Sequence, residues 1–416
     1  MVRSIGRRTL KRMDDAAFDT LVDLLRISRH SKSKRKDRER RRRNKNEHRE
    51  RMSRNRIDNL PDRVFTRMFR LNRIAFNDLL QKITEVMPEK DAVEATRSSG
   101  SVIDNFVRLC MTLRWLAGGS YLDICLLYGA DFSTFYAEDG TLWPTIEAIN
   151  KVLKLRFPTN DPRDEAYNPE ELQRVAMDFS SFSSGIFNSL VGAIDGLVIR
   201  TRKPYKSECS NRRAYRNRKG CFGILCLGVS DIRGKFLSFS CNWTGSTHDS
   251  FAWSTCSLYN KFTLKHITGY HLVGDEAFSN TEFLLSPWPG RSLGPWKDSF
   301  NYQLSKCRQS IERAFGMLVK RWGILQRRLI VSKKRWSLVS VVCAKLHNIC
   351  VDHNVPQLPR LFADITEDDR ILPIFNDNIE EPVHHRATGS RRLSLTNTLE
   401  LQQIRRPQFA MCNTRA

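Results

Sequence analysis

The sequence has no long apolar run, no paired cysteines and too few acids to balance its bases. No apolar stretch approaches the roughly 20 residues of a transmembrane helix, so we expect no insertion into a membrane. The eleven cysteines are scattered, without the short paired spacings of a zinc site and without a preceding secretory signal. This pattern predicts reduced, mostly buried thiols.

The sequence has a large excess of positively charged residues. There are 69 Lys and Arg against 45 Asp and Glu, a formal net charge of +24. Such a charge attracts polyanions, and nucleic acid is the first partner to expect. With 416 residues, 40% of them hydrophobic, the chain is long enough for one large domain with smaller appendages.

Much of the charge lies near the N-terminus. Arg29 to Arg56 holds fifteen Lys or Arg, four acids and a single apolar residue, Met52. This segment cannot build a core, and a nuclear-import signal, a phosphate-binding arm and a solvated tail all fit it. Residues 1–56 are therefore predicted to be a largely disordered basic arm with one short amphipathic helix at Ala17 to Ile27, and the protein is expected in the nucleus.

A small all-helical domain is predicted at residues 57–158. Apolar residues recur there at helical spacing, and Tyr121 to Tyr128, a turn at Gly129 and Ser133 to Tyr136 have the layout of a helix-turn-helix. A recognition helix over Thr134 to Ile149, however, would offer acids and no Lys or Arg to DNA bases. A structural helical hairpin fits the pattern as well.

Residues 185–352 are predicted to form an α/β domain with a mixed sheet covered by helices, because strand-like segments alternate with and precede strong helices. A flexible tail is expected at residues 353–416, where apolar clusters thin out. The predicted strands and helices are Val191–Ile199, Phe222–Ser230, Lys235–Trp243, a helix near Ser250–Leu258, a strand ending at His271–Gly274, and helices at Ser310–Leu325 and Trp336–Cys350.

Two aspartates of this domain follow apolar runs. Asp195 comes after Val191 to Ile194 and precedes Gly196, and Asp275 comes after Leu272 to Gly274. We expect both carboxylates at or near strand ends, where they can converge on one edge of the sheet. A charge beside buried strands is costly unless something neutralises it.

A glutamate on a predicted helix completes the group. Glu312 is next to the apolar stripe of its helix, and Gly316 leaves room one turn later. Converging carboxylates repel one another, but hard divalent cations bind them well. Taken singly, each acid also fits a structural role as a turn residue, a helix cap or a surface charge.

Six segments follow one another along roughly Phe65 to Cys350, namely Leu113–Gly119, Ala193–Gly196, Trp243–Ser250, Gly274–Asp275, Arg308–Arg321 and Leu346–Asn348. Taken in this order, they resemble the PIF/Harbinger transposases and the Harbinger transposase-derived nucleases.

The resemblance implies an RNase H-like catalytic domain whose catalytic triad is Asp195, Asp275 and Glu312, with Mg²⁺ or Mn²⁺ as cofactor. Asp249 matches a further acidic position assigned to metal in the family, although it also fits a helix cap. The resemblance also implies a separate Myb/SANT-like partner protein, and a homo-oligomer is open. Glu276 departs from the family pattern, because relatives commonly have a small residue there.

A basic loop directly follows the Asp195 strand. It holds nine Lys or Arg, one acid and two tyrosines, Tyr205 and Tyr215, so it is predicted to hold phosphates and to stack on unpaired bases. Its basic residues are Arg200, Arg202, Lys203, Lys206, Arg212, Arg213, Arg216, Arg218 and Lys219. A second cluster, residues 327–335, fits a solvated helix end better.

The sequence thus predicts a DNA endonuclease or transposase that cuts phosphodiester bonds by a two-metal mechanism. A domesticated DNA-binding or scaffold protein that no longer cuts is the main alternative. An RNA-binding or RNA-cleaving protein also stays open, because charge alone does not select DNA.

Overall fold

The computed structural model describes residues 52, 54–87, 103–290, 292–357 and 390–407. The predicted basic arm, apart from Met52 and Arg54 to Arg56, and the helix predicted at Ala17 to Ile27 lie outside the described residues.

A five-stranded mixed sheet is the centre of the fold, with strand order β3-β2-β1-β4-β5. The first three strands are antiparallel neighbours, while β4 and β5 run parallel to β1. The strands are β1 Leu190–Arg200, β2 Gly223–Ser230, β3 Phe236–Thr244, β4 His271–Val273 and β5 Leu284–Leu285. The mixed sheet predicted from the sequence is confirmed, although β5 was not foreseen.

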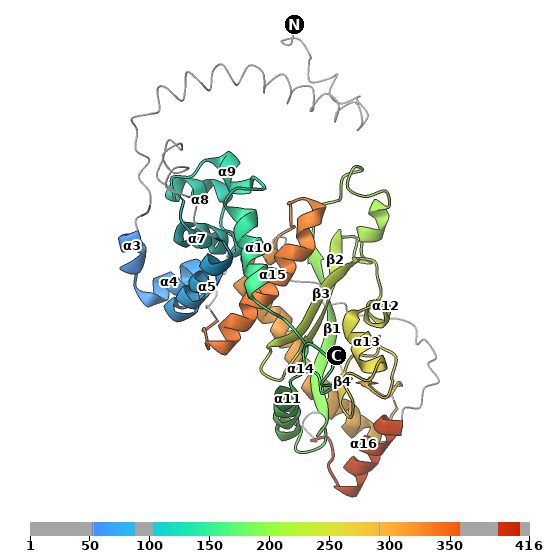
Figure 1. Cartoon of the computed structure of the whole chain (residues 1–416). Coiled ribbons are helices and arrows are strands. Elements are labelled where there is room, and N and C mark those ends of the chain that lie inside the picture. The colour runs from blue at the N-terminus through green and yellow to red at the C-terminus, as the bar shows by residue number, and fades with distance from the viewer. Residues whose placement is uncertain (1–51, 53, 88–102, 291, 358–389, 408–416) are drawn as a thin grey trace, which may run out of the picture. The chain divides into compact units, whose positions relative to one another are not determined.

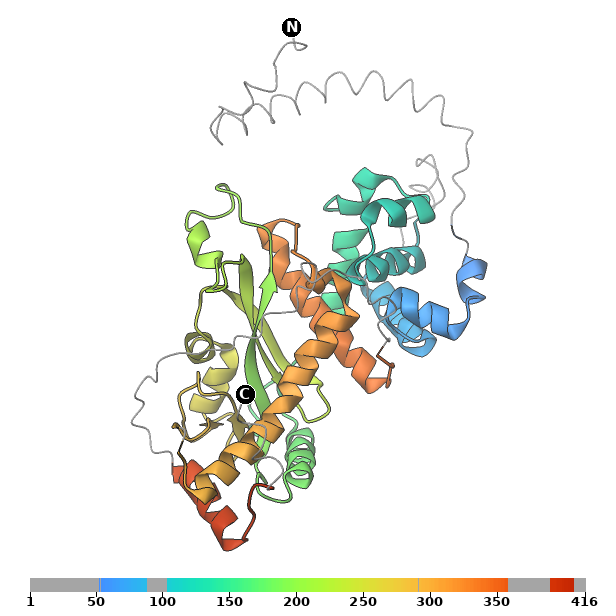
Figure 2. The same cartoon turned by 180° about the vertical axis from the view of Figure 1, so that it is seen from behind.

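Helices cover both faces of this sheet. Every residue of β2 and all but the last of β1 are buried, which accounts for their nearly continuous apolar sequences. Helix α14 (Pro295–Arg321) crosses one face, as Figure 2 shows. Helix α12 (Asp249–Ser254) lies against the other face, where Ala252 packs with Val198 and Leu225 (Figure 1).

The remaining helices precede β1 or follow β5, except α13 and the turn η2, which lie between strands. Several begin at a side chain that accepts a backbone N–H of the first turn, such as Asn72 and Asp104. They are α3 Arg54–Asp58, α4 Asp62–Phe69, α5 Arg73–Val86, α7 Asn105–Leu116, α8 Tyr121–Leu127, α9 Phe132–Tyr136, α10 Leu142–Val152, α11 Pro169–Phe182, α13 Ser257–Thr263, α15 Lys333–Asp352 and α16 Ser390–Leu401, with the 3₁₀ turns η2 Arg212–Tyr215 and η3 Gly323–Gln326.

The two helices of the candidate helix-turn-helix, α8 and α9, lie within one residue of the predicted Tyr121–Tyr128 and Ser133–Tyr136. A continuous recognition helix over Thr134 to Ile149 is not formed, because α9 ends at Tyr136 and α10 starts only at Leu142. Between them the chain turns so tightly that a Cβ on Gly140 would lie 2.0 Å from the Thr134 carbonyl oxygen. The bounds predicted for the domains stay a prediction.

The C-terminal segment contains a docked helix where a flexible tail was predicted. Helix α16 packs against α14, and the Arg392 guanidinium lies 3.9 Å from the centroid of the Trp288 ring. Trp288 in turn donates its indole N–H to Thr396 at 3.0 Å. For residues 390–407 the expectation of loose order is therefore wrong, since cation–π and hydrogen-bond contacts anchor a sparsely apolar sequence.

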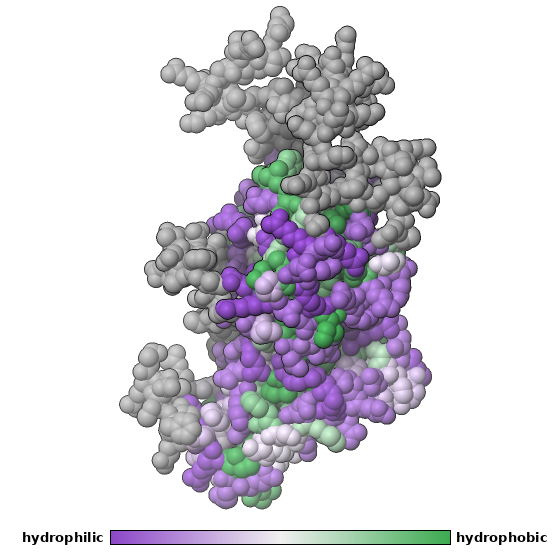
Figure 3. Space-filling view, turned by 90° about the vertical axis from the view of Figure 1, so that its left-hand side faces the viewer, coloured by the Kyte–Doolittle hydropathy of each residue, from purple (hydrophilic) through white to green (hydrophobic). Residues whose placement is uncertain are grey.

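Buried apolar side chains run continuously from the helices before the sheet to α16. Within the described part of the chain all cysteines are free, and all but Cys209 and Cys221 are buried, as predicted. Among the same residues no helix is long and apolar enough to cross a bilayer. Figure 3 shows one face of the molecule, which is mainly hydrophilic with small separate hydrophobic groups.

Candidate active site

Asp195 lies in the middle of β1, not at its end. The expected strand-end position is wrong, because Gly196 does not stop the strand and Leu197 to Arg200 continue it. Its pairing partner on β2 is Gly228, whose Cβ would lie 2.7 Å from the Phe315 ring of α14. Because paired residues share a face of the sheet, the Asp195 carboxylate points to the side that α14 covers.

Asp275 follows the neighbouring parallel strand, β4, as predicted. The Asp275 carboxylate accepts the backbone N–H of Ala277 at 3.0 Å, which fixes a turn directly after the strand. Gly274 must be glycine here, since a Cβ would lie 2.7 Å from the Phe278 ring and 3.2 Å from Ile194. Two adjacent strands therefore bring two aspartates together from positions 80 residues apart.

Glu312 comes to the same place from α14. Its side chain is 38% exposed, which agrees with its expected position at the border of the buried stripe. The guanidinium of Arg308, one turn earlier, lies 2.7 Å from the Glu312 carboxylate and 3.9 Å from that of Asp195. Arg308 thus links the helical acid to the strand acid, while the Cβ position of Gly316 faces open space.

The pKa values of Asp195 and Asp275 are both raised, because their carboxylates are buried. Burial raises the pKa of Asp195 well above its ordinary range, and the nearby carboxylates of Asp275 and Asp249 raise it further, while Arg308 opposes them. Burial also raises the pKa of Asp275, and Arg308 again acts in the opposite direction. Burial therefore favours the neutral form of both aspartates, and a nearby cation is what would keep them ionised.

Asp249, by contrast, lies across β1 from Asp195. It is fully buried at the start of α12, and a Cβ on Gly196 would lie only 2.4 and 2.5 Å from its two carboxylate oxygens. Successive side chains of a strand point to opposite faces, so the Gly196 side of β1 is not the Asp195 side. The assignment of Asp249 to metal stays a prediction, and in this structure its carboxylate packs against the strand that carries Asp195.

The carboxylates around Arg308 are of the ligand type that a hard divalent cation binds. Asp195, Asp275 and Glu312 offer only carboxylate oxygens, the ligands that Mg²⁺ and Mn²⁺ prefer. As the side chains stand, no group of three or more His, Cys, Asp or Glu within the described ranges is arranged to hold a metal ion. The cationic guanidinium of Arg308 instead balances the acids, so ion binding would require Arg308 to turn away.

The predicted basic loop follows β1 and reaches the Asp249 segment. The Ser246 N–H donates to the Ala214 carbonyl at 3.1 Å, and the Arg218 guanidinium lies 3.0 Å from the His248 ring. His248 is therefore a contact of the loop. The exposed bases of the loop are Lys203, Lys206, Arg213, Arg216, Arg218 and Lys219, while Arg200 and Arg212 are partly buried.

One predicted phosphate ligand is already engaged within the loop. The Arg202 guanidinium forms two hydrogen bonds to the Glu208 carboxylate, at 2.7 and 2.5 Å. Burial acts to raise the pKa of Glu208, but bonds from Arg202 and from the backbone N–H groups of Lys333 and Tyr205 lower it to about 2. Arg202 therefore organises the loop and is less available to DNA than its neighbours.

The second basic cluster divides into two parts. Lys334 and Arg335 form ion pairs with Glu138, and Arg335 also pairs with Glu147. Glu138 and Glu147 are acids that a DNA-recognition helix would not be expected to offer. Their ion pairs connect the segment after α9 and helix α10 to helix α15. Arg327 and Arg328 are exposed and lie next to the loop, because Leu329 forms a β-bridge with Thr201.

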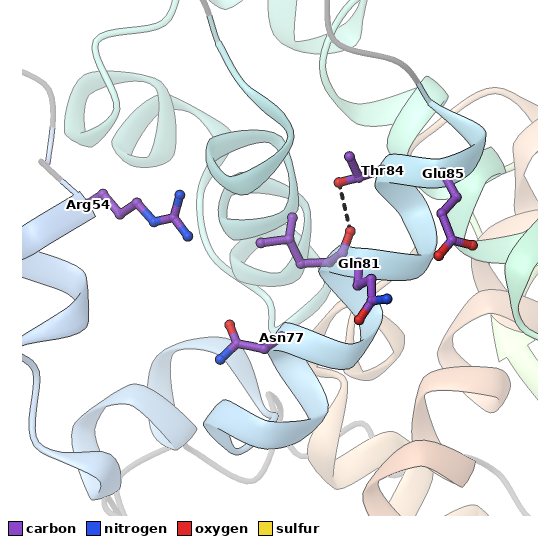
Figure 4. Close-up of a pocket in the computed structure, with 6 residues that line it drawn as sticks. Arg54, Asn77, Gln81, Thr84 and Glu85 are labelled. Carbon is purple, nitrogen blue, oxygen red and sulfur yellow. Dashed lines mark hydrogen bonds between the residues drawn. The ribbon is translucent and has the colours of Figure 1, made fainter.

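A separate hollow of about 540 Å³ lies on the helical part of the chain (Figure 4). Arg54 of α3 lines it from one side, and residues of α5, among them Asn77, Gln81 and Glu85, line it from the other. None of the predicted acids borders it. The hollow is therefore not part of the carboxylate site.

Arg308 was not among the site residues predicted from the sequence. It lies two residues before the predicted helix Ser310–Leu325 and four before Glu312, so extending that helix by one turn would have placed both side chains on one face.

Part of the chain is similar to known proteins. Residues 194–348, which hold all four acids, match the family described as DDE superfamily endonuclease. The chain is 26% identical to the human protein named "Putative nuclease HARBI1" over 204 residues, which is 48% of this chain and 54% of that protein. It is 28% identical to the protein of the same name from Bos taurus, over 47% of this chain and 53% of that protein.

A plant relative is matched over a greater length. "Protein ALP1-like" from Arabidopsis thaliana is 24% identical over 307 residues, which is 70% of this chain and 71% of that protein. The chain spans about half the length of the HARBI1 proteins it matches. No solved structure matches the chain significantly.

Proposed function

Because the chain carries a DDE superfamily endonuclease domain at residues 194–348, we propose that it is a metal-dependent DNA endonuclease of the Harbinger transposase-derived type. The observation that carries the proposal is the convergence of Asp195, Asp275 and Glu312, from two adjacent strands and one helix, on the guanidinium of Arg308. The strand order around these acids supports an RNase H-like arrangement of the domain.

In this proposal Asp195, Asp275 and Glu312 hold the divalent cations. When bound, two such ions activate a water or a 3′-hydroxyl and stabilise the leaving oxygen of an in-line phosphodiester displacement. Arg308 balances the carboxylates before the ions arrive. The low exposure of Asp195, 6%, keeps bulk water from screening its charge.

The chain's own bases bind the DNA. The exposed Lys and Arg of the loop after β1 fix backbone phosphates, which positions the strand without reading its sequence. Arg218 is well placed for this role, because its contact with His248 ties the loop to the segment that leads into Asp249. We also place the protein in the nucleus, on the strength of the basic segment Arg29 to Arg56.

A nicking assay tests the function. Supercoiled DNA is incubated with Mg²⁺ or Mn²⁺ and with wild type, Asp195→Asn, Asp275→Asn or Glu312→Gln; the wild type should nick it and each variant should lose activity by 100-fold or more, on the order of a lost electrostatic catalytic group. Glu276→Gln is the matched control, since Glu276 is an exposed acid adjacent to Asp275. Equal activity in all five proteins contradicts the proposal.

The same experiment separates the main alternative. If the wild type binds DNA in a salt-dependent manner but does not nick it with either metal, the chain is a transposase-derived binding or scaffold protein. Binding and cleavage of RNA, measured at the same salt concentration as for DNA, test whether the chain is an RNA-binding or RNA-cleaving protein instead. The Myb/SANT-like partner and the homo-oligomer stay predictions that come from the resemblance.

A further inference from the structure

Tyr205 is an exposed aromatic ring on the basic loop that the cutting mechanism does not use. Its side chain is 61% exposed, whereas Tyr215, the other tyrosine of the loop, packs edge-on against the buried Trp336 at 5.8 Å. From the sequence, both tyrosines were predicted to stack on unpaired nucleic-acid bases. The structure leaves only Tyr205 with an open ring.

The ring of Tyr205 is held in place from behind. The guanidinium carbon of Arg202 lies 4.0 Å from the Tyr205 centroid and 5.7 Å from the Trp336 centroid. Glu208 fixes Arg202, and the same carboxylate accepts the backbone N–H of Tyr205 at 2.9 Å and that of Lys333 at 3.0 Å. Little conformational freedom is therefore lost when a further flat group stacks on Tyr205.

Exposed basic residues lie near the Tyr205 ring. Lys203 and Lys206 flank Tyr205 and are exposed, and the exposed pair Arg327 and Arg328 joins them through the bridge from Thr201 to Leu329. The one acid of the loop, Glu208, is consumed by its internal bonds. A preorganised aromatic face among bases at phosphate-binding positions is the chemistry that binds single-stranded nucleic acid.

We infer that Tyr205 stacks on an unpaired base of the bound strand, while Lys203, Lys206, Arg327 and Arg328 hold the adjacent phosphates. This inference rests on the proposed function and adds to it that the substrate has a single-stranded segment. Five residues of extended β1 separate Asp195 from the start of the loop, about 17 Å at roughly 3.3 Å per residue. The proposed stacking position on the loop is therefore distinct from the carboxylate site.

Equilibrium binding in metal-free buffer tests the inference without any cutting. The full-length protein is titrated into a fluorescent 20-nucleotide strand, which carries 2-aminopurine to report stacking, and into the matching duplex at the same salt. The variants are Tyr205→Ala, Tyr205→Phe and, as a control, Tyr167→Ala, which removes another exposed tyrosine outside the loop (49% exposed). Thermal unfolding checks that all of them fold.

Tyr205→Ala should weaken binding of the single strand by about 5- to 150-fold, as expected for one lost stacked base. The duplex affinity, the Tyr205→Phe variant and the Tyr167→Ala control should stay within about twofold of wild type, and the 2-aminopurine quenching should disappear only in Tyr205→Ala. Lys206→Ala should weaken strand and duplex alike and lower the salt slope by about 0.7 to 0.9.

Unchanged binding in Tyr205→Ala, or an equal loss on strand and duplex, overturns the inference. An equal loss in Tyr205→Phe overturns it as well, because that variant keeps the ring. Since no metal is present, these outcomes are independent of the nicking assay.

Discussion

Replacing Gly196 by alanine tests the close packing of Asp249 against β1. The added Cβ would lie 2.4 and 2.5 Å from the two oxygens of Asp249, well inside the 3.0 Å that side chains tolerate. Neither group can yield easily, because Asp249 is fully buried and Gly196 lies in the middle of a buried strand. Overpacking of this kind costs about 1 to 3 kcal/mol. At roughly 2 °C per kcal/mol for a large domain, Tm should fall by about 2 to 6 °C.

Gly316→Ala is the matched control for this substitution. A Cβ on Gly316 meets nothing within 4 Å, and Gly316 lies inside α14, where alanine is favoured over glycine by about 0.5 to 1 kcal/mol. Differential scanning calorimetry should therefore show Tm rising slightly in Gly316→Ala and falling in Gly196→Ala.

A double-mutant cycle identifies Asp249 as the cause. In an Asp249→Ala background the carboxylate is gone, so adding Gly196→Ala should cost little, and the two changes should be non-additive by about 0.5 to 3 kcal/mol. Additive effects, or a Gly196→Ala variant as stable as wild type, would refute the placement of Asp249 against Gly196.

Three further changes have defined outcomes. Arg308→Gln removes the cation that competes for the carboxylates, so calorimetric titration should show Mn²⁺ binding up to about fivefold tighter, the worth of a partly exposed ion pair of up to about 1 kcal/mol. Arg335→Ala should lower the free energy of unfolding by about 1 to 3 kcal/mol, because its buried side chain packs on Trp143 and is ion-paired, whereas exposed Lys334→Ala should change it by less than about 0.5 kcal/mol. The pKa of Glu208 falls from its ordinary value of 4.5 to about 2 on folding, so its stabilising effect is complete above about pH 4.5 and is lost as the pH falls towards 2. The difference in unfolding free energy between wild type and Glu208→Gln, from urea titrations, should shrink over that range.

The sheet and its acids were largely predictable because they have local signals. The β1 to β3 strands were placed within one or two residues, since each is an apolar run bounded by turn residues. Glu312 was predicted to lie next to the buried stripe of its helix, because the apolar residues of that stripe recur at helical spacing. The bounds predicted for β1 already enclose Asp195, yet its carboxylate was expected at or near a strand end because Gly196 looks like a strand terminator. The glycine instead makes room for Asp249, which is distant in sequence.

Other features depend on contacts that no local pattern reveals. The first turns of α14 were missed although Phe300, Leu304 and Cys307 lead into Ile311 at helical spacing, because the buried face also includes the polar Ser299 and Gln303. Helix α16 is held by Arg392 stacking on Trp288, a contact over about 100 residues of sequence. The acids Glu138 and Glu147 were considered as part of a DNA reader, yet their partners Lys334 and Arg335 lie nearly 200 residues later.

Diffraction from crystals soaked in Mn²⁺ tests the central claim most directly. The anomalous signal should place one or two Mn²⁺ ions among the carboxylates of Asp195, Asp275 and Glu312, at about 2.0 to 2.3 Å from their oxygens. Arg308 should have turned away from Glu312 in the same crystals. Crystals in which the Arg308 ion pairs persist and no Mn²⁺ lies within reach of these three side chains would contradict the account.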